Sequence, residues 1–379
     1  MPDCGSSLWP CAMTGAVACL AGFEGMHVVI HGSSGCYYYP ATLLDAPLHG
    51  TFILENEVIF GSEDRLKEVI RDLSGRGGRI AVVTTCVPSI LGEDICSMLD
   101  GTDVLLVDSP GFAGELETGY RAALAALSPN VDPARAGVNI DGVCIADPFY
   151  QGNVQEIRRM LGLAGVPTAT VYCRDWFEMA GHAAPLTVGT NDDFASGVGS
   201  RVGGTLGIPA LRDTFGRLAA ECDRADVDPV LSELDMQEER VILACDRYLR
   251  RYDPPSACIF AGSAYAAFAA DTLVRYMDAD ILCVGTRNDP PEHPAGSLKW
   301  EKIPGMDGFR ERIAASDPDL VIGSSFERSV SGDRAFVGII PPLQEKIRLA
   351  HTPLAGTTGL LFFVEDVLNA CMDRRRSKR

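Results

Sequence analysis

Short apolar, β-branched runs alternate with amphipathic segments along almost the whole chain. In the first third the predicted strands are residues 27–32, 79–85 and 102–109. Residues 62–73 and the stretch after Gly114 have the apolar spacing of helices. Because the strand-like runs are almost continuously apolar, they suit parallel strands buried on both faces. The alternation predicts an α/β fold with parallel sheets flanked by helices.

The same alternation continues through two further segments. The later predicted strands are residues 137–143, 168–173, 256–263, 280–286 and 319–325. A long amphipathic helix is expected over 229–252, where the Asp-Pro-Pro that follows ends it. The sequence therefore predicts three Rossmann-like domains, at residues 1–135, 136–252 and 253–379.

Composition limits the class of protein. A chain of 379 residues with 46% hydrophobic content can bury two or three cores. We expect a cytoplasmic protein, because no run has the roughly 18 to 20 uncharged apolar residues of a membrane span and the N-terminus has no secretory pattern. In that compartment the 13 cysteines would be core residues or ligands rather than disulfides. The net charge of −18 opposes binding to nucleic acid.

Several familiar chemistries lack their motifs. The sequence has no GxxxxGK[ST], so any use of ATP would belong to a partner. The glycine-rich run 197–204 is out of register for dinucleotide binding and is expected to be a flexible loop. The histidines show no HxxxH or HExxH pairing, and Cys4, Cys11 and Cys19 lack the CxxC spacing of zinc ribbons.

Three cysteines stand out by position. Cys11, Cys36 and Cys86 each lie at the end of a strand-like run or in a glycine-rich turn, which suits thiolates around an iron–sulfur cluster or zinc. The glycines of the GSSGC turn would allow positive φ and close approach to a cluster. An ordinary turn remains the alternative there. Cys4 is near enough to Cys11 to be an auxiliary ligand.

The other cysteines have a plainer explanation as small core hydrophobes. Those in helical patterns, which we expect in the core, are Cys19, Cys96, Cys245 and Cys371. Those at or near strands, some of which could face a cleft between domains, are Cys144, Cys173, Cys258 and Cys283. Tyr37–Tyr39 would either cover the cluster from water or belong to the core.

Several motifs together resemble the nitrogenase component 1-type oxidoreductase family, especially its β-type subunit. The resemblance is carried by residues 11–36, 55–70, 84–95, 153–166 and 351–370. It implies a three-domain α/β chain in which Cys11, Cys36 and Cys86 bind an iron–sulfur cluster at a subunit interface. The cluster would be of [4Fe–4S] or larger [8Fe–7S] type. Since three thiolates do not complete a [4Fe–4S] site, a homodimer or a related partner subunit is expected.

The resemblance also implies that a different protein supplies the electrons. Low-potential electrons would come from a separate ATP-dependent iron protein. At 379 residues the chain is shorter than typical members, and we find no counterpart of the cysteine and histidine that hold the molybdenum–iron cofactor. It is more similar to short methanogen members, the methanogenesis-marker type above all. Three functions stay open: a reductase subunit, a scaffold for metallocluster assembly, and the reductive cyclase component of coenzyme F430 synthesis.

Overall fold

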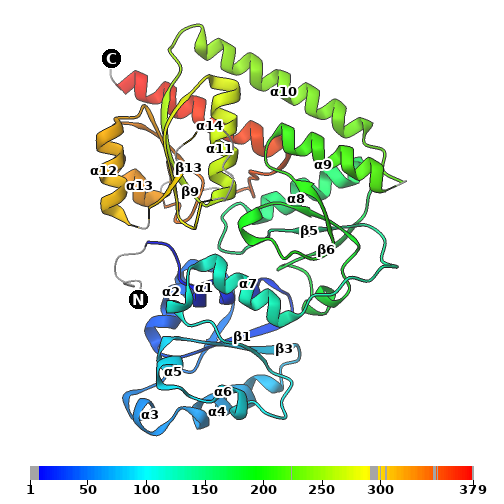
Figure 1. The fold of residues 1–379 in the computed structure, drawn as a ribbon, viewed down its shortest axis with the longest axis vertical. Coiled ribbons are helices and arrows are strands. Elements are labelled where there is room, and N and C mark those ends of the chain that lie inside the picture. The colour runs from blue at the N-terminus through cyan, green and yellow to red at the C-terminus, as the bar shows by residue number, and fades with distance from the viewer. Residues whose placement is uncertain are drawn as a thin grey trace.

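The computed structural model contains three parallel sheets, each covered by helices (Figure 1). It describes residues 8–222, 224–290, 298, 300–303, 305–344, 347 and 349–377. Cys4 therefore lies outside the described residues. The α/β class with parallel, helix-flanked sheets is confirmed.

The first sheet has the strand order β2-β1-β3-β4. Its strands are β1 (Met26–His31), β2 (Leu48–Gly50), β3 (Arg79–Thr84) and β4 (Leu105–Val107). Its helices are α1 (Ala12–Gly22), α2 (Ser34–Leu43), α3 (Glu55–Phe60), α4 (Glu63–Ser74), α5 (Cys86–Leu91), α6 (Ile95–Met98), the 3-10 turn η1 (Gly111–Ala113) and α7 (Leu116–Leu127). Helices α1 and α7 cross closely because Gly15 and Gly119 face backbone of the opposite helix, where any side chain would collide.

The second sheet has the order β6-β5-β7-β8. Its elements are β5 (Val138–Asp141), α8 (Tyr150–Leu163), β6 (Thr168–Val171), η2 (Phe177–Gly181), β7 (Leu186–Gly189), η3 (Asp192–Phe194), β8 (Ser200–Gly204) and α9 (Ile208–Glu221). The expectation of a flexible loop at 197–204 is wrong for the part that forms β8. Gly203 suits a strand here because a side chain would collide with Thr214 of α9, which packs directly on β8.

The third sheet has the order β11-β10-β9-β12-β13. Its strands are β9 (Ser256–Ala261), β10 (Asp280–Thr286), β11 (Trp300–Lys302), β12 (Leu320–Gly323) and β13 (Ala335–Gly338). Its helices are α11 (Ser263–Met277), α12 (Met306–Ser316) and α13 (Ser325–Ser331), with the long α10 (Asp228–Leu249) and α14 (Gly356–Ser377) beside them. Strands β9 and β12 are buried from end to end apart from the partly buried Ser256, as their apolar runs predict.

The last segment of the chain joins the third sheet to the second. Helix α14 packs against β13 and α10, and it also contacts α8 and α9. Just before it, the side-chain oxygen of Asn153 accepts hydrogen bonds from the backbone N–H groups of Leu354 and Ala355, at 2.7 and 2.9 Å. Domain borders at 135/136 and 252/253 therefore stay a proposal, since the C-terminal segment packs across the second of them.

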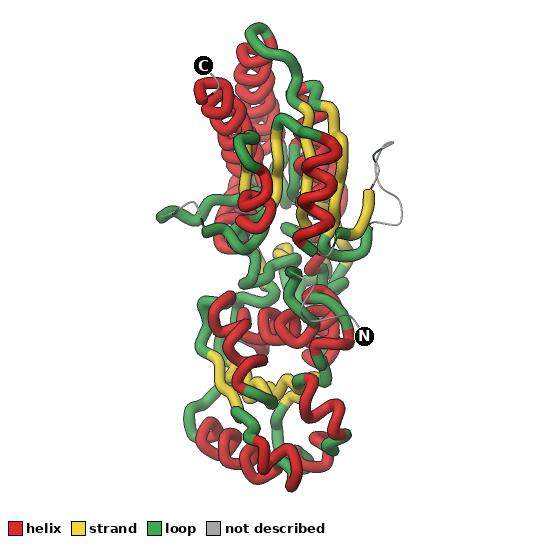
Figure 2. Tube along the Cα trace, turned by 90° about the vertical axis from the view of Figure 1, so that its left-hand side faces the viewer, coloured by secondary structure: helices red, strands yellow, loops and turns green. Residues whose placement is uncertain are grey.

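The molecule is elongated, with the first sheet and its helices forming a separate layer at one end (Figure 2). Within the described ranges, no helix combines the length and apolar character that crossing a bilayer requires. The first layer presents the carboxyl ends of β1 and β3, where the candidate ligands follow. Such carboxyl ends are the usual place for sites in parallel sheets.

Candidate metal centre

Each of the three predicted ligands lies at the start of a helix. Cys11 is the N-cap of α1, Cys36 is in the first turn of α2, and Cys86 is the first residue of α5. All three side chains are half-buried and form no disulfide. The thiolate is the form of cysteine that binds metal.

The thiols meet around Gly111. A Cβ atom at position 111 would lie 3.2 Å from both the Cys11 and the Cys86 sulfur atoms. Cys36 is close enough to both that their charges would act on its ionisation. Gly111 itself is buried, so the space between the thiols depends on the absence of a side chain there. The structure therefore brings Cys11, Cys36 and Cys86 together from three turns.

Backbone contacts fix these turns to one another. The N–H of Ala12 donates to the carbonyl of Gly114 at 2.9 Å, and Cys11 pairs with Glu115 in a single antiparallel bridge. The N–H of Thr85 donates to His31 at 3.1 Å, and Gly32 lies against the Thr85 side chain, where a larger residue would collide. Close approach, rather than the expected positive φ, explains a glycine in this turn, since Gly32 and Gly35 are absent from the positive-φ positions.

Two hydroxyl groups flank Cys36. Burial raises the pKa of the Cys36 thiol, while hydrogen bonds from Ser33 and Thr85 oppose that shift. The buried Thr85 hydroxyl has no nitrogen or oxygen partner, so it is available to a sulfur atom. Hydroxyl donors that point at thiolates suit an iron–sulfur site, where hydrogen bonds to sulfur tune the cluster.

The kind and number of the metal-binding side chains suit an iron–sulfur cluster. Among the described residues, no three His, Cys, Asp or Glu side chains are arranged to hold one metal ion. What the chain offers is three soft thiols at one surface, with hydroxyl donors and closely packed glycines. Soft thiolates in this number fit iron–sulfur chemistry better than they fit a hard cation.

A buried hydrogen-bond network lies behind this site. His31 contacts Thr51 at 3.2 Å and Ser62 at 3.1 Å, and the Ser62 hydroxyl donates to Glu93 at 2.6 Å. Burial lowers the pKa of His31, although Glu93 opposes the shift. The neighbouring Asp94 instead caps α6 by accepting from the N–H of Ser97 at 3.1 Å. The partners of Glu93 are 31 and 62 residues away in sequence, so no local pattern could reveal them.

The tyrosines after Cys36 divide between two roles. Tyr37 donates to the carbonyl of Leu48 at 3.3 Å and contacts the Phe52 ring edge-on. Tyr38 is 69% exposed and Tyr39 is 46% exposed. Exposed large side chains also follow the other ligand turns, at Ile90 and Phe112. The rim of the site is therefore an exposed apolar surface, which we call the cluster face (Tyr38, Tyr39, Ile90, Leu91 and Phe112).

Most of the remaining cysteines are in the core, as expected. Cys19, Cys245 and Cys371 are buried in helices, but Cys96 is exposed on α6 and that expectation is wrong. The short α6 turns Cys96 outward while Ile95 fills the core. Cys258 and Cys283 pair across β9 and β10. They pack against Phe309 of α12, in the core beneath that helix.

Comparisons with known proteins agree with this arrangement. The family model described as nitrogenase component 1 type oxidoreductase matches residues 11–372. The chain belongs to this family. The family binds iron–sulfur clusters and forms assemblies of several subunits with an iron-protein partner.

Individual relatives differ in how much they cover. The nitrogenase iron-molybdenum cofactor biosynthesis protein NifE of Clostridium pasteurianum is 24% identical, over 73% of this chain and 68% of its own length. The nitrogenase molybdenum-iron protein beta chain of Methanococcus maripaludis is 22% identical. The match covers 96% of this chain and 93% of that relative. The match to the Frankia alni beta chain, at 28% identity, spans 41% of this chain and only 35% of that relative.

A solved structure, "Nitrogenase Cp1 at pH 6.5", superposes with a TM-score of 0.84 at 15% identity, covering 99% of this chain and 94% of that one. It confirms the predicted component 1-like fold.

Proposed function

We propose that this protein is a nitrogenase-like iron–sulfur oxidoreductase subunit whose cluster is held by Cys11, Cys36 and Cys86. The observation that supports this most is the meeting of three half-buried thiols around Gly111, at the carboxyl side of the first sheet. Buried core cysteines have no need of such a glycine. The cluster would accept low-potential electrons and pass them to a substrate or cofactor.

A second subunit completes the proposed site. Three thiolates leave a [4Fe–4S] cluster one ligand short, whereas two chains with three each could hold an [8Fe–7S] cluster. The cluster face is the proposed surface for this contact, because exposed large side chains such as Tyr38 and Ile90 closely follow Cys36 and Cys86 in sequence. The partner is a second copy of this chain or a related subunit.

An ATP-dependent iron-protein reductase is the proposed electron source. The sequence has no P-loop of its own, which fits electron delivery by a separate nucleotide-hydrolysing partner. We place the protein in the cytoplasm, in metabolism related to methanogenesis. This chain's residues would hold the cluster, exclude water from it, and donate hydrogen bonds to it from Ser33 and Thr85.

A scaffold for building or carrying a metallocluster is the second candidate. One relative is named as a cofactor biosynthesis protein, and its similarity extends over 73% of this chain. The reductive cyclase component of coenzyme F430 synthesis is a third. A scaffold would release its iron to an acceptor protein, whereas a reductase would keep its iron through many turnovers.

The test is iron and acid-labile sulfide analysis with EPR on anaerobically purified protein. Cys36→Ala should lose most of its iron, while Cys96→Ala removes an exposed thiol of the same chain and should lose none. Light scattering on both variants should give a dimer. About four or eight irons per dimer are expected, the numbers of the two cluster types.

An iron-free, well-folded wild type after anaerobic reconstitution would contradict the proposal. Equal iron in Cys36→Ala and wild type would contradict the assigned ligand. To separate the two leading functions, the loaded protein is mixed with a metal-free acceptor and a chemical reductant. Retention of iron favours the reductase, and its transfer favours the scaffold.

A further inference from the structure

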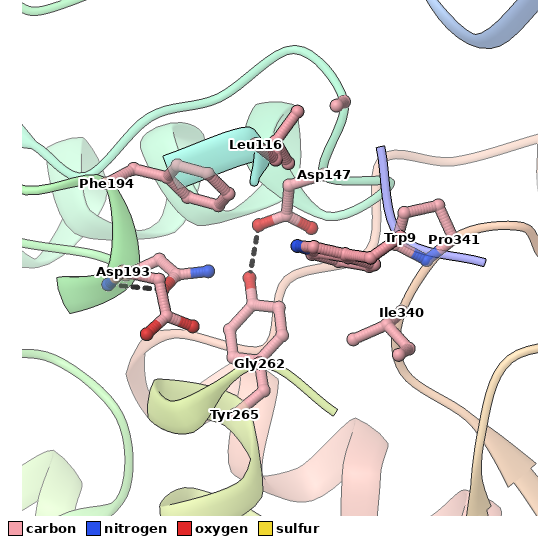
Figure 3. A pocket seen from close by; sticks show the side chains of 11 residues that line it. Trp9, Leu116, Asp147, Asp193, Phe194, Gly262, Tyr265, Ile340 and Pro341 are labelled. Atoms are coloured by element: carbon pink, nitrogen blue, oxygen red, sulfur yellow. Dashed lines mark hydrogen bonds between the residues drawn. The ribbon is translucent and has the colours of Figure 1, made fainter. Parts of the chain in front are cut away.

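A small cavity lies where the second and third sheets meet the first layer. It is formed by the loops that follow the carboxyl ends of β5 and β7, by the start of α11 after β9, and by the turn after β13. Its apolar walls are Trp9, Leu116, Phe194, Ile340 and Pro341 (Figure 3). About 20 Å³ is open to the centre of a water molecule, which is room for about one water.

The polar groups of the cavity are acidic or neutral. Asp147 and Asp193 come from the second sheet and Tyr265 comes from the third. Among the described residues, no Lys, Arg or His lines the space. The Tyr265 hydroxyl donates to Asp147 at 2.5 Å, and Asn153 donates to Tyr265 at 2.8 Å. Figure 3 shows Tyr265 turned toward the Asp147 carboxylate. Side-chain oxygen atoms from the second and third sheets therefore line the same cavity.

Each carboxylate is held in place by backbone. Asp147 also accepts from the N–H of Phe149 at 2.9 Å, and Asp193 accepts from the N–H of Ala264 at 3.2 Å. Burial raises the pKa of both side chains to about 6, so they are mainly ionised at pH 7.5. Negative charge in a small apolar space with no cationic side chain in its lining disfavours any anionic occupant.

Trp9 closes one side of the cavity. Its indole N–H lies 3.1 Å from both Glu117 oxygens, and its ring borders Ile340 and Pro341 (Figure 3). Indole is the aromatic ring that binds cations best, and carboxylates supply the opposite charge. A cation held here would face an aromatic ring on one side and Asp147 on another.

We propose that this cavity binds a small nitrogen-centred organic cation, held between the Trp9 indole and the Asp147 carboxylate. In the proposed oxidoreductase, on which this role rests, the cation is the substrate or the charged end of one. Anionic cofactors are excluded from the space. Trp9 is two residues before Cys11, so binding would take place next to the cluster-bearing turn.

Methylammonium is a suitable probe, because it is the smallest primary alkylammonium ion. The space holds about one water, so a wall of the cavity would have to move to admit it. The methyl NMR resonance of methylammonium is followed as the anaerobically purified full chain is titrated. Stacking on the indole should move the resonance upfield and saturate, with a Kd on the order of 10 mM for so small a ligand. Acetate, of opposite charge, and the bulkier tetramethylammonium should show no saturable shift.

Asp147→Asn should weaken methylammonium binding at least tenfold, because the amide keeps an oxygen for the Phe149 N–H and turns its NH2 toward the Tyr265 hydroxyl, but removes the charge. Asp246→Asn removes the same charge from the exposed face of α10 and should change the Kd less than twofold. If Asp147→Asn fails to fold, Trp9→Leu is a second variant that tests the same site. Without the indole, the upfield shift should disappear.

The proposal is overturned by a non-saturable shift in wild type, by equal binding of acetate, or by equal weakening in Asp246→Asn. Iron is measured on the same samples. Methylammonium binding without iron would keep this site while removing the proposed cluster function. Iron in the wild type without methylammonium binding would keep the proposed cluster function and remove this site.

Discussion

Two groups of three cysteines differ in almost everything but residue type. The cluster thiols, Cys11, Cys36 and Cys86, are half-buried at helix starts. The interior thiols, Cys19, Cys144 and Cys173, are fully buried. Helix α1 carries Cys11 at its N-cap and Cys19 near its other end. The position on the helix, rather than the cysteine itself, separates a candidate ligand from a core residue.

The interior thiols are already satisfied by their neighbours. The sulfur atoms of Cys19 and Cys173 are 3.6 Å apart, and the Tyr120 hydroxyl lies 2.8 Å from Cys173. Burial raises the pKa of Cys19 and of Cys144 well above the ordinary value, which keeps both as inert thiols. The cluster thiols instead have hydroxyl donors and a glycine that leaves space between them.

Gly111→Ala should have the largest effect, because its Cβ would lie 3.2 Å from the sulfur atoms of both Cys11 and Cys86. We expect loss of most cluster iron with little change in thermal stability, measured by iron analysis and melting. Gly162→Ala is the matched control, since nothing lies within 4 Å of its added methyl group. Full iron in Gly111→Ala would mean that the thiols do not share the space beside Gly111.

Thiol labelling of native protein should separate the two groups by rate. In iron-free protein, iodoacetamide should label Cys96 and the cluster thiols, while Cys19, Cys144 and Cys173 react only after unfolding. Loading with iron should then protect the cluster thiols and leave Cys96 reactive. Peptide mass spectrometry reads each position separately. Rapid labelling of Cys19 in the native state would remove the contrast between the groups.

Local sequence pattern was enough for much of the fold, and it singled out the three cysteines that the structure brings together around Gly111. Their role as cluster ligands stays a prediction. The continuous apolar runs of β1, β3 and β9 and the glycine turn before Cys36 each lie within a few neighbouring residues. Contacts between distant segments were not predictable in this way. The hydrogen bond of His31 with Glu93 and that of Trp9 with Glu117 both join segments far apart in sequence. Cys96 was misplaced because its short helix has too few residues to define an inner face.

Glu117 accepts a hydrogen bond from the Trp9 indole and should make stability depend on pH. Burial raises its pKa from 4.5 to about 7. Between these values the native state binds more protons than the unfolded chain, so the free energy of unfolding falls as the pH rises from about 4.5 to 7. Glu117→Gln keeps an acceptor for the Trp9 indole and should remove about 2 to 3 kcal/mol of that fall.

Urea unfolding at pH 5 and pH 8 measures this difference in both proteins. The exposed Asp246→Asn should leave the fall as in wild type. An unchanged fall in Glu117→Gln would mean that Glu117 titrates near its ordinary pKa.

The smallest expected effect comes from the interior group. Tyr120→Phe removes a hydroxyl that donates to the carbonyl of Val143 at 2.6 Å and contacts Cys173. An unpaired buried carbonyl costs about 1 to 3 kcal/mol, so urea unfolding should shift by that amount. Iron content should not change, because the proposed ligands are Cys11, Cys36 and Cys86 and not the interior thiols. Tyr38→Phe removes the same group from the exposed cluster face and should shift unfolding by less than about 0.5 kcal/mol. Iron lost in Tyr120→Phe with unfolding unchanged would instead tie the interior group to the cluster.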